Sequence, residues 1–184
     1  MGEGGLQDAV ILVDDRHVTL TMPTWFDDDV VEHERSVGHD HVVVRLGGGR
    51  YAIAAADVAE VVAVPHCTRV PGTPPWVVGV ANWRGHVLPV IDLRPLLGVG
   101  AGPLPTSARL VVVSVEDVEV GLVTEAVTGL LEAGDDLRTT PATLTGDASD
   151  LVAGVADDGA GGPVAVLSTR AVLALSSRVG RSGV

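Results

Sequence analysis

Apolar residues in this chain occur in short runs separated by glycine, proline and acidic residues. The clearest pattern lies at 76–97, where two apolar runs flank a polar corner at 82–85. Runs of Val and Ile of this length around a glycine are typical of two strands joined by a tight turn. Gly85 suits a backbone with positive φ. We therefore predict a hairpin with Arg84 at its tip, followed by a short helix at 94–97.

The same reasoning divides the rest of the first half into short β elements. In chain order, the pattern predicts a strand at 42–46, a glycine turn at 47–49, a strand at 51–54, a helical turn at 55–59, a strand at 60–64, a proline-containing loop at 65–75 and, after the hairpin, a linker at 98–106. Glycine and proline in that linker indicate flexibility.

The second half of the sequence repeats the first. Three segments align in the same order and without gaps: 120–131 on 51–62, 152–156 on 77–81, and 164–173 on 88–97. Ordered matches at a nearly constant offset indicate two copies of one β unit, 41–100 and 108–174, each too small to bury a core alone. Short alternating strands favour small closed barrels, because closure removes exposed edges.

Charged positions do not follow this repeat. Glu60 aligns with Gly129, Asp92 aligns with Ser168, and the corner at 82–85 aligns with 157–160, which reads Asp-Asp-Gly-Ala. Positions that build the fold therefore recur, whereas charged positions do not. This difference places the expected function in the first unit or between the two units.

Composition restricts the class of protein. The formal net charge of −12 argues against a nucleic-acid partner, because phosphate binding needs a basic surface. No apolar run approaches the roughly 18 residues of a membrane span, so we expect no membrane insertion. The single cysteine and the lack of a secretory n-region suit a cytoplasmic protein. The length of 184 residues suits one domain or two small lobes.

The first forty residues form a separate acidic segment, with ten acidic and two basic residues. We expect 1–40 to be a flexible arm, and 175–184 to be a flexible tail. The alternative for the arm is an ordered hairpin at 10–22 that turns at Asp14-Asp15.

The sequence contains no catalytic or metal-binding motif that we recognise. It has no nucleophile elbow, phosphate-binding loop or zinc-protease helix, and His66 beside Cys67 does not by itself align a base with a thiolate. His33, His39 and His41 do not have the spacing of a structural zinc site. We expect a non-enzyme without metal, cofactor or small-molecule substrate.

The segment around the predicted hairpin resembles the CheW family of chemotaxis coupling proteins. The resemblance lies in Gly79-Val80, Asn82-Trp83-Arg84-Gly85 and Pro89-Val90-Ile91-Asp92-Leu93-Arg94, and it extends more weakly over 42–173. It implies a CheW-like domain at 41–174 with a mainly β fold: two five-stranded SH3-like barrels packed side by side, with short helices at the ends of the lobes.

The resemblance also implies a site. In the family, the glutamate and arginine that match Glu60 and Arg84 lie beside the groove between the barrels, where a receptor hairpin docks. The expected groove residues are Val58, Glu60, Val61, Asn82, Arg84, Gly85 and Val87. The expected structural motif is Gly79, Pro89, Asp92 and Arg94, with Asp92 as the N-cap of the short helix.

Two questions about this site stay open at the level of sequence. Arg84 either offers its donors to a partner, oriented by Glu60, or only forms an internal ion pair with Glu60. Trp83 replaces the usual leucine of the family and is either an exposed anchor or folded back on its own lobe.

The implied partners are proteins. They are the cytoplasmic tip of a methyl-accepting chemoreceptor and the regulatory domain of a CheA-type histidine kinase, coupled by a non-catalytic adaptor. The alternative is a CheW-like scaffold of another two-component pathway, for motility or gene regulation, without a transmembrane receptor.

Overall fold

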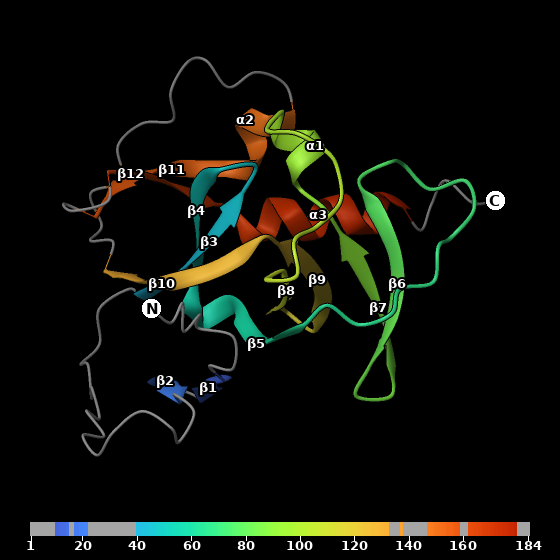
Figure 1. Ribbon diagram of the computed structural model, residues 1–184, viewed down its shortest axis with the longest axis horizontal. Helices are drawn as coiled ribbons and strands as arrows, with labels where there is room; N and C mark the ends of the chain where they lie inside the picture. Colours follow the sequence, from blue (N-terminus) through green and yellow to red (C-terminus); the bar gives the residue numbers. More distant parts are fainter. Residues whose placement is uncertain are drawn as a thin grey trace, which may run out of the picture.

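The protein is mainly β and contains two five-stranded sheets (Figure 1). The computed structural model describes residues 10–14, 17–21, 40–132, 137, 147–158 and 162–179. The first sheet has the order β10 (Ala126–Glu132), β3 (Asp40–Leu46), β4 (Gly49–Ala54), β12 (Pro163–Leu167), β11 (Val152–Asp157). The second has the order β5 (Val58–Ala63), β8 (Arg109–Val115), β9 (Val118–Thr124), β7 (His86–Ile91), β6 (Val77–Trp83).

In the described part of the chain, four short helical segments accompany the sheets. They are the 3-10 turn η1 (Ala55–Asp57), α1 (Arg94–Leu97), α2 (Asp147–Leu151) and α3 (Thr169–Val179). In Figure 1, α3 lies at the centre of the molecule, between the strands of the two sheets. None of the described helices is long and apolar enough to cross a membrane.

Each sheet contains strands from both halves of the sequence. β3 and β4 of the first half join β10, β11 and β12, while β8 and β9 of the second half join β5, β6 and β7. We expected one lobe from 41–100 and one from 108–174, so the structure changes this expectation: the two halves exchange their first two strands. Parallel pairing of β4 with β12 and of β7 with β9 completes the exchange.

The register of the strands follows the sequence repeat. The register shift between Val58 and Glu60 in β5 recurs at the aligned position of the second half, between Val127 and Gly129 in β10. The shift at Gly79 in β6 likewise recurs at Gly154 in β11. The two units are therefore copies at the level of the backbone, including their bulges.

Among the described residues, three groups of buried side chains hold the sheets together. The largest lies between the sheets and includes residues of β3, β4, β8 and β9 with Val172 and Leu173 of α3. Each sheet also has its own small core, and in the first sheet Leu131 and Ala156 share one core although β10 and β11 are opposite edges. A sheet whose two edges contribute to one core is strongly curled.

Curling does not amount to closure by hydrogen bonds. No strand pairing among the described residues joins β10 to β11 or β5 to β6. After β5, however, the chain returns to the opposite edge, where Thr68 and Val80 exchange backbone hydrogen bonds of 2.8 and 2.9 Å. The structure thus contains two curled five-stranded sheets. The strand pairings of the described residues do not close either sheet into the barrel that we expected.

Two segments expected to be flexible have defined contacts. In the acidic arm, β1 (Val10–Asp14) and β2 (His17–Thr21) form an antiparallel hairpin, which is the alternative that the sequence left open for this segment. The rest of 1–39 and residues 180–184 lie outside the described residues, whereas residues 175–179 of the tail that we expected at 175–184 belong to α3, so the prediction was wrong for them. In the linker, Val99 donates a 3.0 Å hydrogen bond to the Arg94 carbonyl, and the Gly102 carbonyl accepts one of 2.9 Å from the Arg94 side chain.

Candidate partner-binding site

The hairpin of β6 and β7 projects from the second sheet, as predicted (Figure 1). Trp83 pairs with His86, so Arg84 and Gly85 form the two-residue turn. Their φ angles of 49° and 84° are the positive values that such a turn requires. The Gly85 amide also donates to Asn82 Oδ1 at 3.2 Å. Arginine is an unfavourable residue at the first turn position, costing about 1–2 kcal/mol.

Three side chains meet behind this turn. Glu60 Oε2 accepts a 2.8 Å hydrogen bond from Trp83 Nε1 and lies 3.1 Å from Arg84 Nη2. The Arg84 guanidinium lies 4.9 Å from the centre of the Trp83 ring. Trp83 is thus half-buried and folded back on its own lobe. The Arg84 side chain remains 64% exposed, so it is oriented by Glu60 and Trp83 while most of its surface stays open to a partner.

This group also connects opposite edges of the second sheet. Glu60 lies in β5, whereas Trp83 ends β6 at the other edge. The Glu60 contacts therefore bridge the gap where no ladder forms among the described strands. Arg84 therefore lies beside the contact that joins the two edges of this sheet.

The other expected groove residues lie in different environments. Val58 is 2% exposed and belongs to the central core, so it does not line a surface groove. Val61 is half-buried against that core. Asn82 and Val87 pair across the hairpin and are exposed, Val87 to 76%. The open surface of the site therefore consists of the hairpin tip rather than of β5.

The expected structural motif builds a buried ion cluster. Arg94 is 5% exposed, and its Nε and Nη2 donate to the Asp92 carboxylate at distances from 2.8 to 3.1 Å. Its Nη1 donates to Glu125 Oε1 at 3.2 Å. The hydrogen bond to Asp92, and then that to Glu125, raises the pKa of Arg94.

The helix cap differs from the prediction. Leu93 rather than Asp92 is the N-cap residue of α1, and its side chain makes no capping hydrogen bond. Asp92 lies one position earlier, where it accepts the Arg94 amide at 3.0 Å. Because the same carboxylate binds the Arg94 guanidinium, its main role is to hold Arg94.

Glu125 was not among the predicted residues. It joins four segments: its carboxylate contacts Arg94 and the Gly48 amide, its amide donates to the Arg45 carbonyl at 3.0 Å, and its carbonyl accepts from Ser107 at 2.9 Å. Its alignment partner in the repeat is an alanine, position 56. Glu125 is thus a charged residue without a charged counterpart in the repeat, and this signal in the sequence could have identified it.

Gly79 and Pro89 have local structural roles. A Cβ on Gly79, at φ +149°, would lie 2.3 Å from the Thr68 carbonyl oxygen, so only glycine allows the chain after β5 to approach β6. Pro89 precedes Val90, where the parallel pairing with β9 starts. Its missing N–H therefore interrupts no bond of that ladder.

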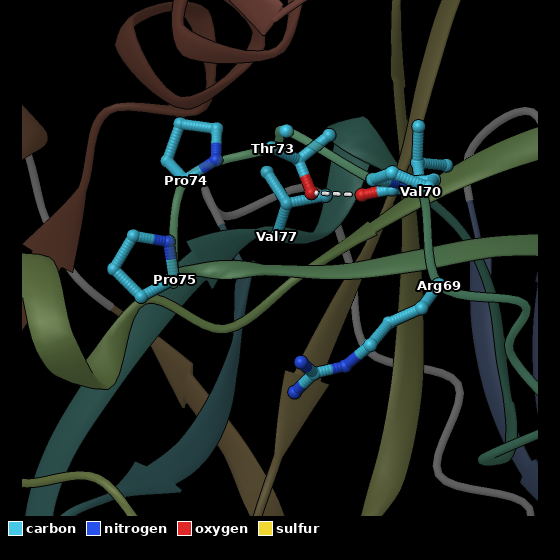
Figure 2. Close-up of a pocket in the computed structure, with 8 residues that line it drawn as sticks. Arg69, Val70, Thr73, Pro74, Pro75 and Val77 are labelled. Carbon is cyan, nitrogen blue, oxygen red and sulfur yellow. Dashed lines mark hydrogen bonds between the residues drawn. The ribbon is translucent and has the colours of Figure 1, made fainter.

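A shallow depression of about 240 Å³ lies at the opposite end of β6 from Arg84. Figure 2 shows its lining by the loop 69–75 and Val77, with Thr73 Oγ1 donating to the Val70 carbonyl at 2.8 Å. Its walls are valine, proline, glycine and threonine with one arginine, Arg69, and include no carboxylate. Elsewhere in the described part of the chain, no group of three or more His, Cys, Asp or Glu side chains could hold a metal ion.

The fold and site define a class: duplicated β domains of two strand-exchanged sheets, with an arginine in the hairpin turn of the first copy, where the aligned sequence of the second copy reads Asp-Asp-Gly-Ala. A family model described as "CheW-like domain" matches residues 40–177. The chain belongs to the CheW-like domain family.

Individual relatives agree with this assignment. The chain is 41% identical over 86 residues to protein PilI of Pseudomonas aeruginosa, covering 47% of this chain and 48% of that protein. It is 35% identical over 92 residues to chemotaxis protein CheW of Bacillus subtilis, covering 50% and 59%. The matches thus span about half of these relatives' lengths. The crystal structure of scaffolding protein TtCheW from Thermoanaerobacter tengcongensis superposes with a TM-score of 0.65 and 26% identity, covering 74% of this chain and 88% of that one.

Proposed function

We propose that this protein is a non-catalytic, cytoplasmic adaptor that couples the cytoplasmic tip of a chemoreceptor to the regulatory domain of a CheA-type histidine kinase. Membership of the CheW-like family supports a coupling or scaffolding role. Such a protein acts by binding two partners in a fixed geometry, so that a conformational change in one alters the other. It makes and breaks no covalent bond.

The observation that carries the proposal is the oriented arginine at the hairpin tip. Arg84 has an unfavourable backbone conformation, is held by Glu60 and Trp83, and stays 64% exposed. A guanidinium held this way presents several donors in a fixed geometry to carboxylates or to the free carbonyls at a helix turn. The exposed Val87 on the same hairpin adds an apolar contact. The tip of a receptor's helical hairpin offers both kinds of group.

Curled sheets with their own cores support the finer description of the fold as two SH3-like barrels. On this proposal, the kinase domain packs against the outer ends of the barrels, and the receptor binds at Glu60 and Arg84. The two partners then occupy different surfaces of one protein.

The test is calorimetric titration of the full chain with each partner from the same cell. We expect binding of the kinase regulatory domain and of a receptor tip fragment, with Arg84→Ala abolishing only the second. Arg170→Ala is the matched control, because Arg170 is also exposed and ion-paired, with Glu116 at 3.3 Å. Equal loss of receptor binding in both variants would contradict a specific role of Arg84, and absence of kinase binding would contradict the coupler.

A second candidate is a CheW-like scaffold of a pathway other than chemotaxis. The similarity to PilI, which does not carry the name CheW, supports it. Deletion of residues 1–39 separates the two candidates, since a pure chemotaxis coupler should remain competent without them. A chain that binds a histidine kinase domain but no chemoreceptor fragment would favour the scaffold.

A further inference from the structure

The turn between β8 and β9 lies at the same end of the second sheet as Arg84. Val115 pairs with Val118, so residues 116–117 form this turn. β9 begins directly after it, β7 begins directly after the turn that contains Arg84, and the two strands are parallel neighbours. Neighbouring strands that run in the same direction from their turns place both turns at one end of the sheet.

The side chains of this second turn are acidic and open to solvent. Glu116, Asp117 and Val118 are exposed, Val118 to 46%. Glu116 forms an ion pair with Arg170, whereas the Asp117 carboxylate has no hydrogen bond or ion pair with any other described residue. The corresponding turn of the first copy is Gly47-Gly48, which carries no charge. The acidic turn is therefore a second charged feature without a counterpart in the repeat.

Two exposed valines lie beside the turns. Ile91 of β7 pairs with Leu122 of β9, and both belong to the central core. Val87 precedes Ile91 by four residues and Val118 precedes Leu122 by four, so the two valines lie at the same level of the sheet and on the face of that core. Their side chains are 76% and 46% exposed. An apolar patch therefore adjoins a cationic turn on one side and an anionic turn on the other.

We propose that the receptor tip lies across both turns and binds the surface formed by Arg84, Val87, Val118 and Asp117. The inference rests on the function proposed above for Arg84. In the strand order β8-β9-β7-β6, the centres of the two turns are two strand spacings apart, about 10 Å. Helices that pack in a hairpin have axes about 8–10 Å apart. Each of the two helices at a receptor tip can therefore meet one turn.

Charge determines which groups of the partner this surface selects. Arg84 binds a carboxylate or free carbonyls, the valines contact an apolar side chain, and Asp117 binds a lysine or arginine of the partner. Because the two turns carry opposite charges, the tip binds in one orientation only, since the reversed orientation would bring like charges together. The fitting partner is thus a helical tip of mixed charge rather than a uniformly acidic or basic one.

Calorimetric titration of the full chain with a receptor tip fragment from the same cell tests the second contact. Asp117→Asn removes one charge and suits the turn, because asparagine tolerates the φ of 64° at this position. Val118→Thr removes an apolar methyl group and keeps a β-branched side chain. We expect receptor binding to weaken about threefold in Asp117→Asn and about fourfold in Val118→Thr. The effect of Asp117→Asn should vanish at about 1 M NaCl, where the Debye length is about 3 Å.

Two matched controls lie outside this surface. Asp150→Asn makes the same charge change at an exposed residue of α2. Val70→Thr makes the same apolar change at a valine that is 38% exposed and lines the depression at the opposite end of β6. Both controls should bind the receptor fragment as the parent does. All four variants should keep the parent's affinity for the kinase regulatory domain.

Exchange of each lysine and arginine of the fragment for glutamine identifies the group that meets Asp117. One exchange should weaken binding to the parent but not to Asp117→Asn, and the absence of such a pair would contradict the contact. Receptor binding as in the parent in both Asp117→Asn and Val118→Thr, with loss in Arg84→Ala, would overturn the second contact and leave the proposed function standing. Receptor binding that also survives Arg84→Ala would overturn both. A change in self-association of Asp117→Asn in sedimentation, without a change in receptor binding, would assign the surface to a second copy and refute the proposal.

Discussion

Replacing Arg94 by alanine tests whether the buried ion cluster holds the two sheets together. The Arg94 side chain is 6% exposed, and it faces carboxylates of Asp92 and Glu125 that are 13% and 23% exposed. Removing one partner of a buried ion pair costs about 3–5 kcal/mol, because the remaining charge stays desolvated. Since both carboxylates keep some contact with water, we expect a loss near the lower limit, about 3 kcal/mol.

Urea and thermal unfolding, followed by tryptophan fluorescence and circular dichroism, measure this loss. For a domain of this size, about 3 kcal/mol lowers Tm by about 6–12 °C. The exposed pair of Arg170 and Glu116, with side chains 82% and 77% exposed, provides the control, and Arg170→Ala should cost less than about 1 kcal/mol. In the double variant Arg94→Ala/Glu125→Gln the loss should be smaller than the sum of the single losses, because fewer charges remain unpaired. A loss in Arg94→Ala no larger than in Arg170→Ala would refute the reasoning.

Three further predictions concern single positions. Gly79→Ala should destabilise the protein by about 1–3 kcal/mol more than Gly129→Ala in urea unfolding, because both glycines have φ near 150° but only a Cβ on Gly79 meets Thr68; equal losses would contradict the close approach. Arg84→Asn should raise stability by about 0.5–1 kcal/mol, since asparagine tolerates positive φ, while receptor binding is lost; a loss of stability would mean that the Glu60 contact outweighs the strain. Burial raises the pKa of the Cys67 thiol. The stability that the neutral buried thiol contributes is therefore present below the unfolded pKa and is lost as pH rises through the folded pKa. Alkylation of Cys67 at pH 8 should be slower than alkylation of free cysteine, and an equal rate would contradict the burial.

Local elements could be predicted because their causes are local. The turn at Arg84-Gly85 follows from one glycine between two apolar runs, and the structure confirms the hairpin and the mainly β fold with two five-stranded sheets. The hairpin at 10–21 also follows from local alternation. We favoured a flexible arm for this segment because of its acidic charge, but the charge of 1–40 comes largely from residues outside the two strands.

The strand exchange could not be predicted from the same information. Both halves carry the same alternation of apolar positions, so β4 could satisfy its buried face equally well beside β7 or beside β12. The choice is made by parallel pairings between strands that lie far apart in the sequence. The contact of Arg94 with Glu125, which joins residues of the two halves, was inaccessible for the same reason.

The two copies show how a binding site can be placed on a duplicated scaffold. β5 and β10 carry the same register shift at corresponding positions, and the residue after the shift is Glu60 in one copy and Gly129 in the other. The bulge is thus a property of the fold, while the side chain at the bulge is free to vary. In the first copy that side chain reaches Trp83 and Arg84 at the neighbouring tip, whereas the aligned corner of the second copy has Asp-Asp-Gly-Ala and no arginine. The bulge is present in both copies, whereas Glu60 and Arg84 have no acidic and basic counterparts at the aligned positions, so their ion pair is not a feature that both copies of the β unit require, which agrees with the partner-binding role proposed above for Arg84.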